Sequence, residues 1–160
     1  MAEQRQITIE RTYEASSDDI WQLWTTAEGI ESWWAPDGFT VAVRKLELEP
    51  AGELLYAMTA TAPEQIAFMQ SAGMPLMNEA RKTFTAVDRP HRLGYMSVVD
   101  FVPGIEPYEF ATVVELEPRS GGVRVVMTID PMHDEEWTQR LVAGRENELD
   151  NLAAVIAARP

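Results

Sequence analysis

One long amphipathic segment in the last quarter of the chain constrains the fold more than any other feature. Asp134 or a neighbouring residue caps this segment as a helix, and Asp134, Glu135 and Glu136 suit the positive end of a helix. A stripe at near-helical spacing follows, formed by Trp137, Leu141, Arg145, Glu148, Leu149, Leu152 and Ile156. A sheet with one apolar face needs a cover, and no other predicted element is long enough to provide it.

Most of the remaining chain alternates between apolar and polar residues, with the period of two that β-strands have. The apolar phase slips after Val43, so we expect a bulge or bend near Arg44 and Lys45. Short turns such as Arg119-Ser120-Gly121-Gly122 imply antiparallel pairing. The predicted strands cover residues 7–13, 39–48, 54–60, 79–87, 93–101, 108–116 and 123–129.

Two short helices are predicted after the first strand. Ser16 caps the first in a capping-box pattern with Asp19, and Thr26 caps the second, which Pro36 ends. Adjacent tryptophans, Trp33 and Trp34, close this second helix, and neighbours on a helix point about 100° apart. One indole can therefore enter the core while the other covers an edge or an opening.

The segment of residues 61–77 is rich in methionine and interrupts the strand pattern. A short helix around Ile66 and Met69 is predicted there, and Gly73 and Pro75 end it. We expect this insertion to form a flap over the sheet.

These elements predict an α+β fold. A curved antiparallel sheet of six or seven strands wraps around the long C-terminal helix, and the two short helices close one end of the groove. The length of 160 residues suggests a single domain spanning residues 1–160.

Charge and composition restrict the function. The net charge of −13 opposes binding to nucleic acid or to anionic membranes. The sequence has no cysteine, which excludes disulfides and thiol nucleophiles. The opening residues are polar, and no apolar run is long enough to span a membrane, so we expect a cytoplasmic protein.

The chain also resembles a known family. The stretches "ITIERTYEASSDDIWQLWTT", "SWWAPDGF", "VDRPHRLGY" and "MTIDPMHDEEWTQRLVAGRENELDNLAAVI" resemble the START-like, or SRPBCC, superfamily with its helix-grip fold. Within it, the chain is most similar to the group named after the C-terminal domain of the activator of heat-shock protein 90 ATPase. The stretch from Thr61 to Met77 is longer than the turn expected there. The resemblance implies binding of apolar small molecules or of proteins, and eukaryotic co-chaperones of this kind carry an additional N-terminal domain.

We predict a small-molecule cleft between the sheet and the C-terminal helix, with the two tryptophans and the methionine-rich insertion framing its entrance. Aromatic rings give large contact areas, and methionine adapts to irregular ligands. Core packing is the alternative for each of these residues. The candidate ligand-binding residues are Trp33, Trp34, Met58, Phe68, Met69, Met74, Met77, Phe84, Tyr95, Phe110, Trp137, Leu141, Arg145 and Glu148.

Three polar or small positions allow two interpretations each. Arg145 and Glu148 either give a ligand a polar handle or pair with one another or with Arg81 or Glu79. Gly144 either leaves space above a pocket or permits a close approach of helix and sheet.

Metal or cofactor chemistry is not expected. The two histidines, His91 and His133, lie far apart in the sequence, and no glycine-rich phosphate loop occurs. We therefore expect neither a metal nor a cofactor.

The sequence leaves three functions open. The first is a binding protein for a small apolar or amphipathic molecule. The second is an aromatase- or cyclase-type enzyme, with Arg145, Glu148 and Tyr95 as its only plausible polar groups. The third is a chaperone-linked protein-interaction module, and a homodimer through an edge strand is also open.

Overall fold

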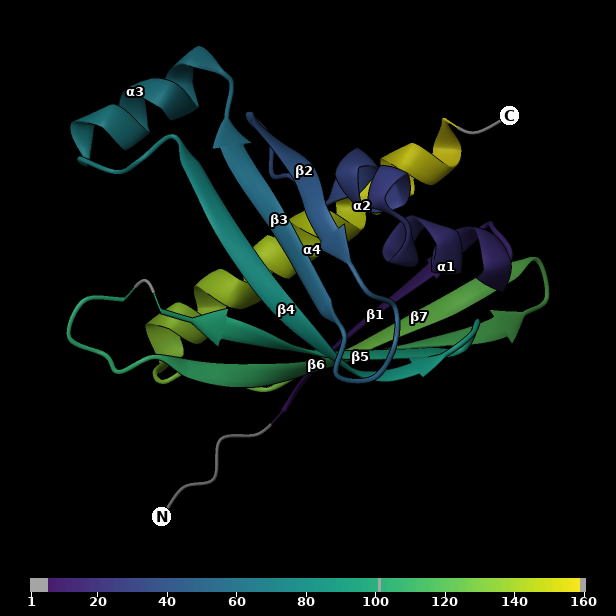
Figure 1. The fold of residues 1–160 in the computed structure, drawn as a ribbon. Helices are drawn as coiled ribbons and strands as arrows, with labels where there is room; N and C mark the ends of the chain where they lie inside the picture. The colour runs from purple at the N-terminus through teal and green to yellow at the C-terminus, as the bar shows by residue number, and fades with distance from the viewer. Residues whose placement is uncertain (1–5, 101, 159–160) are drawn as a thin grey trace.

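A computed structural model describes residues 6–100 and 102–158. Seven strands form one antiparallel sheet in the order β1-β7-β6-β5-β4-β3-β2 (Figure 1). The strands are β1 (Ile7–Tyr13), β2 (Phe39–Leu46), β3 (Glu53–Ala60), β4 (Met77–Asp88), β5 (Arg92–Val99), β6 (Tyr108–Arg119) and β7 (Gly122–Ile129). The helices are α1 (Ser17–Thr25), α2 (Ala27–Trp33), α3 (Pro63–Ser71) and α4 (Glu135–Ala157). The predicted α+β architecture is confirmed.

The helix starts are fixed by the side chains that the sequence indicates. Ser16 Oγ accepts a hydrogen bond from the backbone N–H of Asp19 at 3.1 Å, and Thr26 Oγ1 accepts one from Gly29 at 3.0 Å. Asp134 Oδ1 accepts the backbone N–H of Trp137 at 2.8 Å. Each cap satisfies a donor that the first helical turn leaves free.

The strand pairing explains the slip of the apolar phase. The register between β2 and β3 shifts between Val43 and Lys45, which confirms the predicted bulge. Gly121 has a positive φ of 81° in the tight turn between β6 and β7, as the hairpin signal predicts. Phe101, at the end of a predicted strand, lies outside the described residues.

Helix α4 crosses the concave face of the curved sheet, so that the strands grip it (Figure 1). Leu149 and Leu152 are fully buried in the core. Tyr13 Oη donates to the Leu149 carbonyl at 2.9 Å, which ties α4 to β1. Asn151 Nδ2 donates to the Ala35 carbonyl at 3.1 Å, which ties α4 to the chain after α2. These contacts hold the helix at a fixed place over the sheet.

The methionine-rich insertion forms α3, which lies apart from the other helices (Figure 1). Within α3, Met69 is buried, whereas its neighbour Phe68 is 62% exposed. The predicted short helix is confirmed.

The surroundings of Gly144 match neither of the two roles considered for it, which are space above a pocket and a close approach of helix and sheet. It is exposed, and a Cβ built there meets no heavy atom within 4 Å, so helix and sheet do not approach closely at this point. We therefore expect Gly144→Ala to raise the free energy of unfolding by about 1 kcal/mol, since alanine is the better helix former. Chemical denaturation would measure the change.

Gly29→Ala is a suitable control because a Cβ there would lie 2.5 Å from the Gln22 carbonyl oxygen. This second substitution should destabilise the fold. A loss of stability with Gly144→Ala would contradict the open environment of Gly144.

Candidate functional site

A cleft of about 300 Å³ lies between the inner face of the sheet and α4. Strands β3 to β6 supply its floor, and the first half of α4 forms its roof. The lining residues are Tyr56, Ala80, Arg81, Lys82, Ser97, Val98, Phe110, Met132, Trp137, Arg140, Leu141 and Arg145. The cleft thus combines apolar walls with a few polar groups, as small-molecule sites do.

An outer groove of about 610 Å³ adjoins this cleft and shares Ala80, Arg81, Val98 and Trp137 with it. Met74, from the segment after α3, lines the groove. The methionine-rich insertion therefore contributes to the approach to the cleft.

Lys82 is the central polar residue of the cleft. It lies on β4 directly opposite Ser97 on β5, and its side chain is buried. Lys82 Nζ donates a hydrogen bond to Ser97 Oγ at 2.7 Å. The antiparallel register thus places an amine and a hydroxyl side by side on the floor.

The surroundings of Lys82 disfavour its charged form. Burial, the larger cause, and the nearby Arg145 cation together lower the pKa of Lys82 to about 7, with Glu148 partly offsetting them. The Nζ atom lies 5.6 Å from the Trp34 ring centre and 5.2 Å from that of Tyr95, so two rings support the ammonium form. We therefore expect Lys82 to change protonation near neutral pH.

Arg145 and Glu148 form a largely buried ion pair on α4, with Arg145 Nη1 3.0 Å from Glu148 Oε1. This is the intrahelical pairing that the sequence offers as one of two interpretations. Burial opposes the charge of Arg145, but Glu148 outweighs it and raises the pKa of the guanidinium. Burial also raises the pKa of both Tyr56 and Tyr95, which keeps their hydroxyl groups protonated.

Both tryptophans of the pair lie in the core and neither lies at an entrance. Trp33 Nε1 donates to the Leu23 carbonyl at 2.8 Å. Trp34 packs edge-on against Tyr56, with ring centres 5.5 Å apart, and thereby supports the cleft from behind. Ring contacts on both sides of Trp33, to Trp24 at 4.7 Å and to Trp34 at 5.9 Å, explain why both indoles are enclosed.

The other candidate residues divide into three groups. Phe110, Trp137, Leu141 and Arg145 line the cleft, and Glu148 pairs with the last of them. Met69, Phe84 and Tyr95 are buried, and Met58 packs at the edge of the core. Phe68, Met74 and Met77 are exposed on or after α3, and of these Met74 lines the outer groove.

Sequence reasoning missed Lys82, Ser97 and Tyr56. Their positions carry a signal, because Lys82 lies two residues before the buried Phe84, and Ser97 lies two residues after the buried Tyr95. Period-two alternation places each on the inner face of its strand. A lysine on a core-facing strand position is unusual and indicates a function for its amine.

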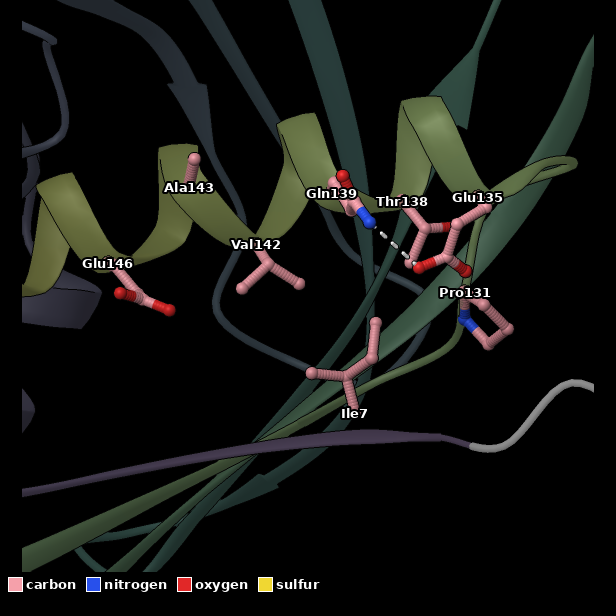
Figure 2. A pocket seen from close by; sticks show the side chains of 8 residues that line it. All are labelled: Ile7, Pro131, Glu135, Thr138, Gln139, Val142, Ala143 and Glu146. Atoms are coloured by element: carbon pink, nitrogen blue, oxygen red, sulfur yellow. Dashed lines mark hydrogen bonds between the residues drawn. The ribbon is translucent and has the colours of Figure 1, made fainter.

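A second groove, of about 570 Å³, lies on the other side of α4 beside β1. Figure 2 shows Val142 pointing from α4 toward Ile7, with Glu135 and Gln139 joined by a hydrogen bond at the rim. Its charged lining residues are Glu135 and Glu146, both of them exposed. The groove is larger but lacks a buried ionisable group, so we assign the candidate site to the cleft.

The histidines do not form a metal site. His133 Nδ1 lies 2.7 Å from the Tyr108 hydroxyl, which positions the loop before α4. Within residues 6–100 and 102–158, no cluster of three His, Cys, Asp or Glu side chains could hold a metal ion. In the same part of the chain, no helix has the length and apolar run that crossing a membrane requires.

Comparison with known families supports the resemblance seen in the sequence. The model of the family described as Activator of Hsp90 ATPase homolog 1-like protein matches residues 14–157. The chain belongs to this family. The Activator of Hsp90 ATPase homolog 1-like fold is the START-like helix grip, and the seven-stranded sheet around α4 agrees with it.

Solved structures share the fold of this family member at low identity. Protein CV1439 from Chromobacterium violaceum aligns with a TM-score of 0.77 and 17% identity, over 96% of this chain and 98% of that one. The AHSA1-like protein from Aeromonas hydrophila aligns with a TM-score of 0.74 and 22% identity, over 96% of this chain and 93% of that one. Protein Ms6760 from Mycobacterium smegmatis aligns with a TM-score of 0.72 and 21% identity, over 96% of this chain and 91% of that one. None of the curated proteins compared with the chain matches it.

Proposed function

We propose that this protein binds a small, largely apolar or amphipathic molecule in the cleft between the sheet and α4. The observation that carries the proposal is the cleft of about 300 Å³ directly beneath the helix, walled by Phe110, Trp137 and Leu141. Its volume is at the lower end of that of small-molecule sites. Buried apolar area would supply most of the affinity.

Two substitutions on neighbouring residues of α4 test this proposal. Leu141→Trp adds bulk within the cleft, whereas Val142→Trp adds the same kind of bulk in the groove beside β1 (Figure 2). The neutral fluorescent probe N-phenylnaphthylamine reports occupancy of an apolar site. We expect Leu141→Trp to weaken probe binding at least tenfold and Val142→Trp to leave it nearly unchanged.

The reverse pattern would assign the site to the groove beside β1. Equal binding by all three proteins would show that neither cavity takes the probe, and the proposal would fail. Circular dichroism of each variant confirms that the fold is retained.

An aromatase- or cyclase-type enzyme is the second candidate, because Arg145 lines the cleft and lies within hydrogen-bonding distance of Glu148. Lys82, with its pKa of about 7, adds a group suited to proton transfer. We rank this candidate lower because Glu148 is engaged in neutralising Arg145 and does not line the cleft.

The chaperone-linked interaction module has weaker support. Phe68, Met74 and Met77 are exposed around α3, but this candidate calls for a filled interior, and a cleft of about 300 Å³ lies beneath α4. The cytoplasmic location, the absence of nucleic-acid and membrane partners, and a homodimer through an edge strand stay predictions from the sequence.

A further inference from the structure

The charge of the cleft is opposite to that of the protein. Its lining includes Arg81, Lys82, Arg140 and Arg145 but no aspartate or glutamate. The whole chain, however, has 26 acidic residues against 13 basic ones. A lining drawn at random from this sequence would contain more acidic than basic residues, since the chain has 26 acids and 13 bases, so the concentration of bases is a property of this site.

Three of these four bases already have acidic partners. Arg140 Nη2 lies 2.9 Å from Glu136, and Arg145 Nη1 lies 3.0 Å from Glu148. Arg81 Nε lies 3.6 Å from Glu53. These pairs leave little net charge on the walls of the cleft.

Lys82 differs from the three arginines. No ion pair between the residues that the structure describes includes it, and Ser97 is its hydrogen-bond partner. An ammonium group has three hydrogens to donate, so this single bond leaves donor capacity in the cleft. Because Ser97 accepts from Lys82, the hydrogen of its hydroxyl group is also available to an acceptor.

Other buried donors in the same region lack an acceptor. Trp34 Nε1 and Arg145 Nε have no hydrogen-bond partner within the described part of the chain. Trp34 lies against the Lys82 ammonium, and Arg145 lines the cleft. This region therefore has spare hydrogen-bond donors and needs a hydrogen-bond acceptor. A negatively charged acceptor would also balance the positive charge of Lys82.

We propose that the cleft takes amphipathic organic acids, with the acidic head group bound by Lys82 and Ser97 and the apolar body held against Phe110, Trp137 and Leu141. This inference rests on the proposed function and specifies its ligand class. Glu79 and Asp100 line the outer groove, where water screens their charge more than in the buried cleft.

The proposal makes binding dependent on pH. An acid head group pairs with the ammonium form of Lys82, and this form declines as the pH rises above about 7. The charged groups facing Lys82 are Arg145, which disfavours the ammonium, and Glu148, which favours it. Tyr56 and Tyr95 stay neutral in this range because burial raises their pKa. Affinity for an anion should therefore fall up to tenfold for each pH unit above 7.

Two fluorescent probes with nearly the same body test the head-group preference. Anilinonaphthalene sulfonate carries an acidic group, and N-phenylnaphthylamine lacks it. We expect the wild-type protein to bind the sulfonate at least tenfold more tightly at pH 6.5, a value just below the pKa of Lys82. Lys82→Met should remove this preference by weakening the sulfonate alone, and Lys82→Gln should do the same.

The chain has one other lysine, Lys45, which provides a matched control. Lys45 is exposed, pairs with Glu47 and Glu53, and is not among the residues that line the cleft. Lys45→Met should leave the affinity for both probes unchanged. An equal loss with Lys45→Met would show that the sulfonate binds by general charge attraction, which would overturn the inference.

The outcomes separate this inference from the proposed function. If Leu141→Trp weakens the neutral probe but the wild type does not prefer the sulfonate, the cleft binds ligands and the inference fails. If Leu141→Trp affects neither probe, both fail. A sulfonate affinity that does not change between pH 6.5 and pH 9, the range over which the pKa of about 7 predicts loss of the ammonium, would also overturn the inference.

Discussion

Replacing Lys82 with methionine is expected to raise the free energy of unfolding at pH 7 by about 2 to 4 kcal/mol. The reason is that the folded protein keeps the amine in a buried environment, where its pKa falls from 10.5 to about 7. Methionine has a similar length and carries no charge to desolvate. The substitution removes one hydrogen bond, to Ser97, and this loss reduces the gain.

The stabilisation expected from Lys82→Met should vary with pH. Between pH 7 and pH 10.5 the unfolded state holds the Lys82 proton and the folded state has lost it, so stability rises with pH through this interval. Below about pH 7 the folded and unfolded states both hold the Lys82 proton, and the free-energy cost of burying the charged amine stays at its maximum. The advantage of Lys82→Met should therefore be largest near pH 6 to 7 and disappear near pH 10.5.

Urea denaturation of both proteins across this pH range measures the difference. Lys45→Met should leave the stability nearly unchanged, because Lys45 is exposed. A Lys82→Met protein that is less stable than the wild type, or whose advantage does not vary with pH, would contradict this account of Lys82. A residue that lowers stability and is nevertheless present in the cleft fits a functional role.

Glu148→Gln is expected to destabilise the protein by about 3 kcal/mol, since it leaves the buried Arg145 guanidinium without its counter-charge. The loss of Glu148 should also lower the pKa of Lys82, because Glu148 is the group that raises it. Thermal and chemical denaturation measure the first effect, and NMR titration of the Lys82 side chain measures the second.

The exposed pair of Arg140 and Glu136 provides the control for this substitution. Its side chains are 60% and 71% exposed, so Glu136→Gln should change the stability little. Replacing both Arg145 and Glu148 by apolar residues should restore most of the stability lost in Glu148→Gln. Equal effects of Glu148→Gln and Glu136→Gln would mean that burial does not strengthen the Arg145–Glu148 pair.

The fold could be predicted from local signals in the sequence. Ser16, Thr26 and Asp134 cap helices through contacts within three residues, so local patterns identify them. The bulge between Val43 and Lys45 follows from a slip in alternation that is visible in one strand. The α4 stripe follows from the helical period, and Leu149 and Leu152 are buried as it requires.

The cleft could be predicted only in part. Trp137, Leu141 and Arg145 can be identified from the core-facing stripe of α4, and Phe110 from the alternation of apolar residues along β6. Lys82 is harder to identify, because lysine is usually exposed. Its position opposite Ser97 also depends on how β4 pairs with β5, which the sequence of one strand does not reveal. The enclosure of Trp33 and Trp34 likewise depends on packing between elements, namely on Trp24 from α1 and Tyr56 from β3.

Carbon-13 NMR of the lysine ε-methylene groups tests the central claim most directly, since the chain holds only Lys45 and Lys82. The account predicts one resonance that titrates near pH 7 and another that titrates above 10.5, where the partners Glu53 and Glu47 raise the pKa of Lys45. Anilinonaphthalene sulfonate should shift the first resonance and raise its midpoint while leaving the second unchanged. Two resonances that both titrate near 10.5 or above, and neither of which responds to the probe, would contradict a ligand site built around a buried Lys82.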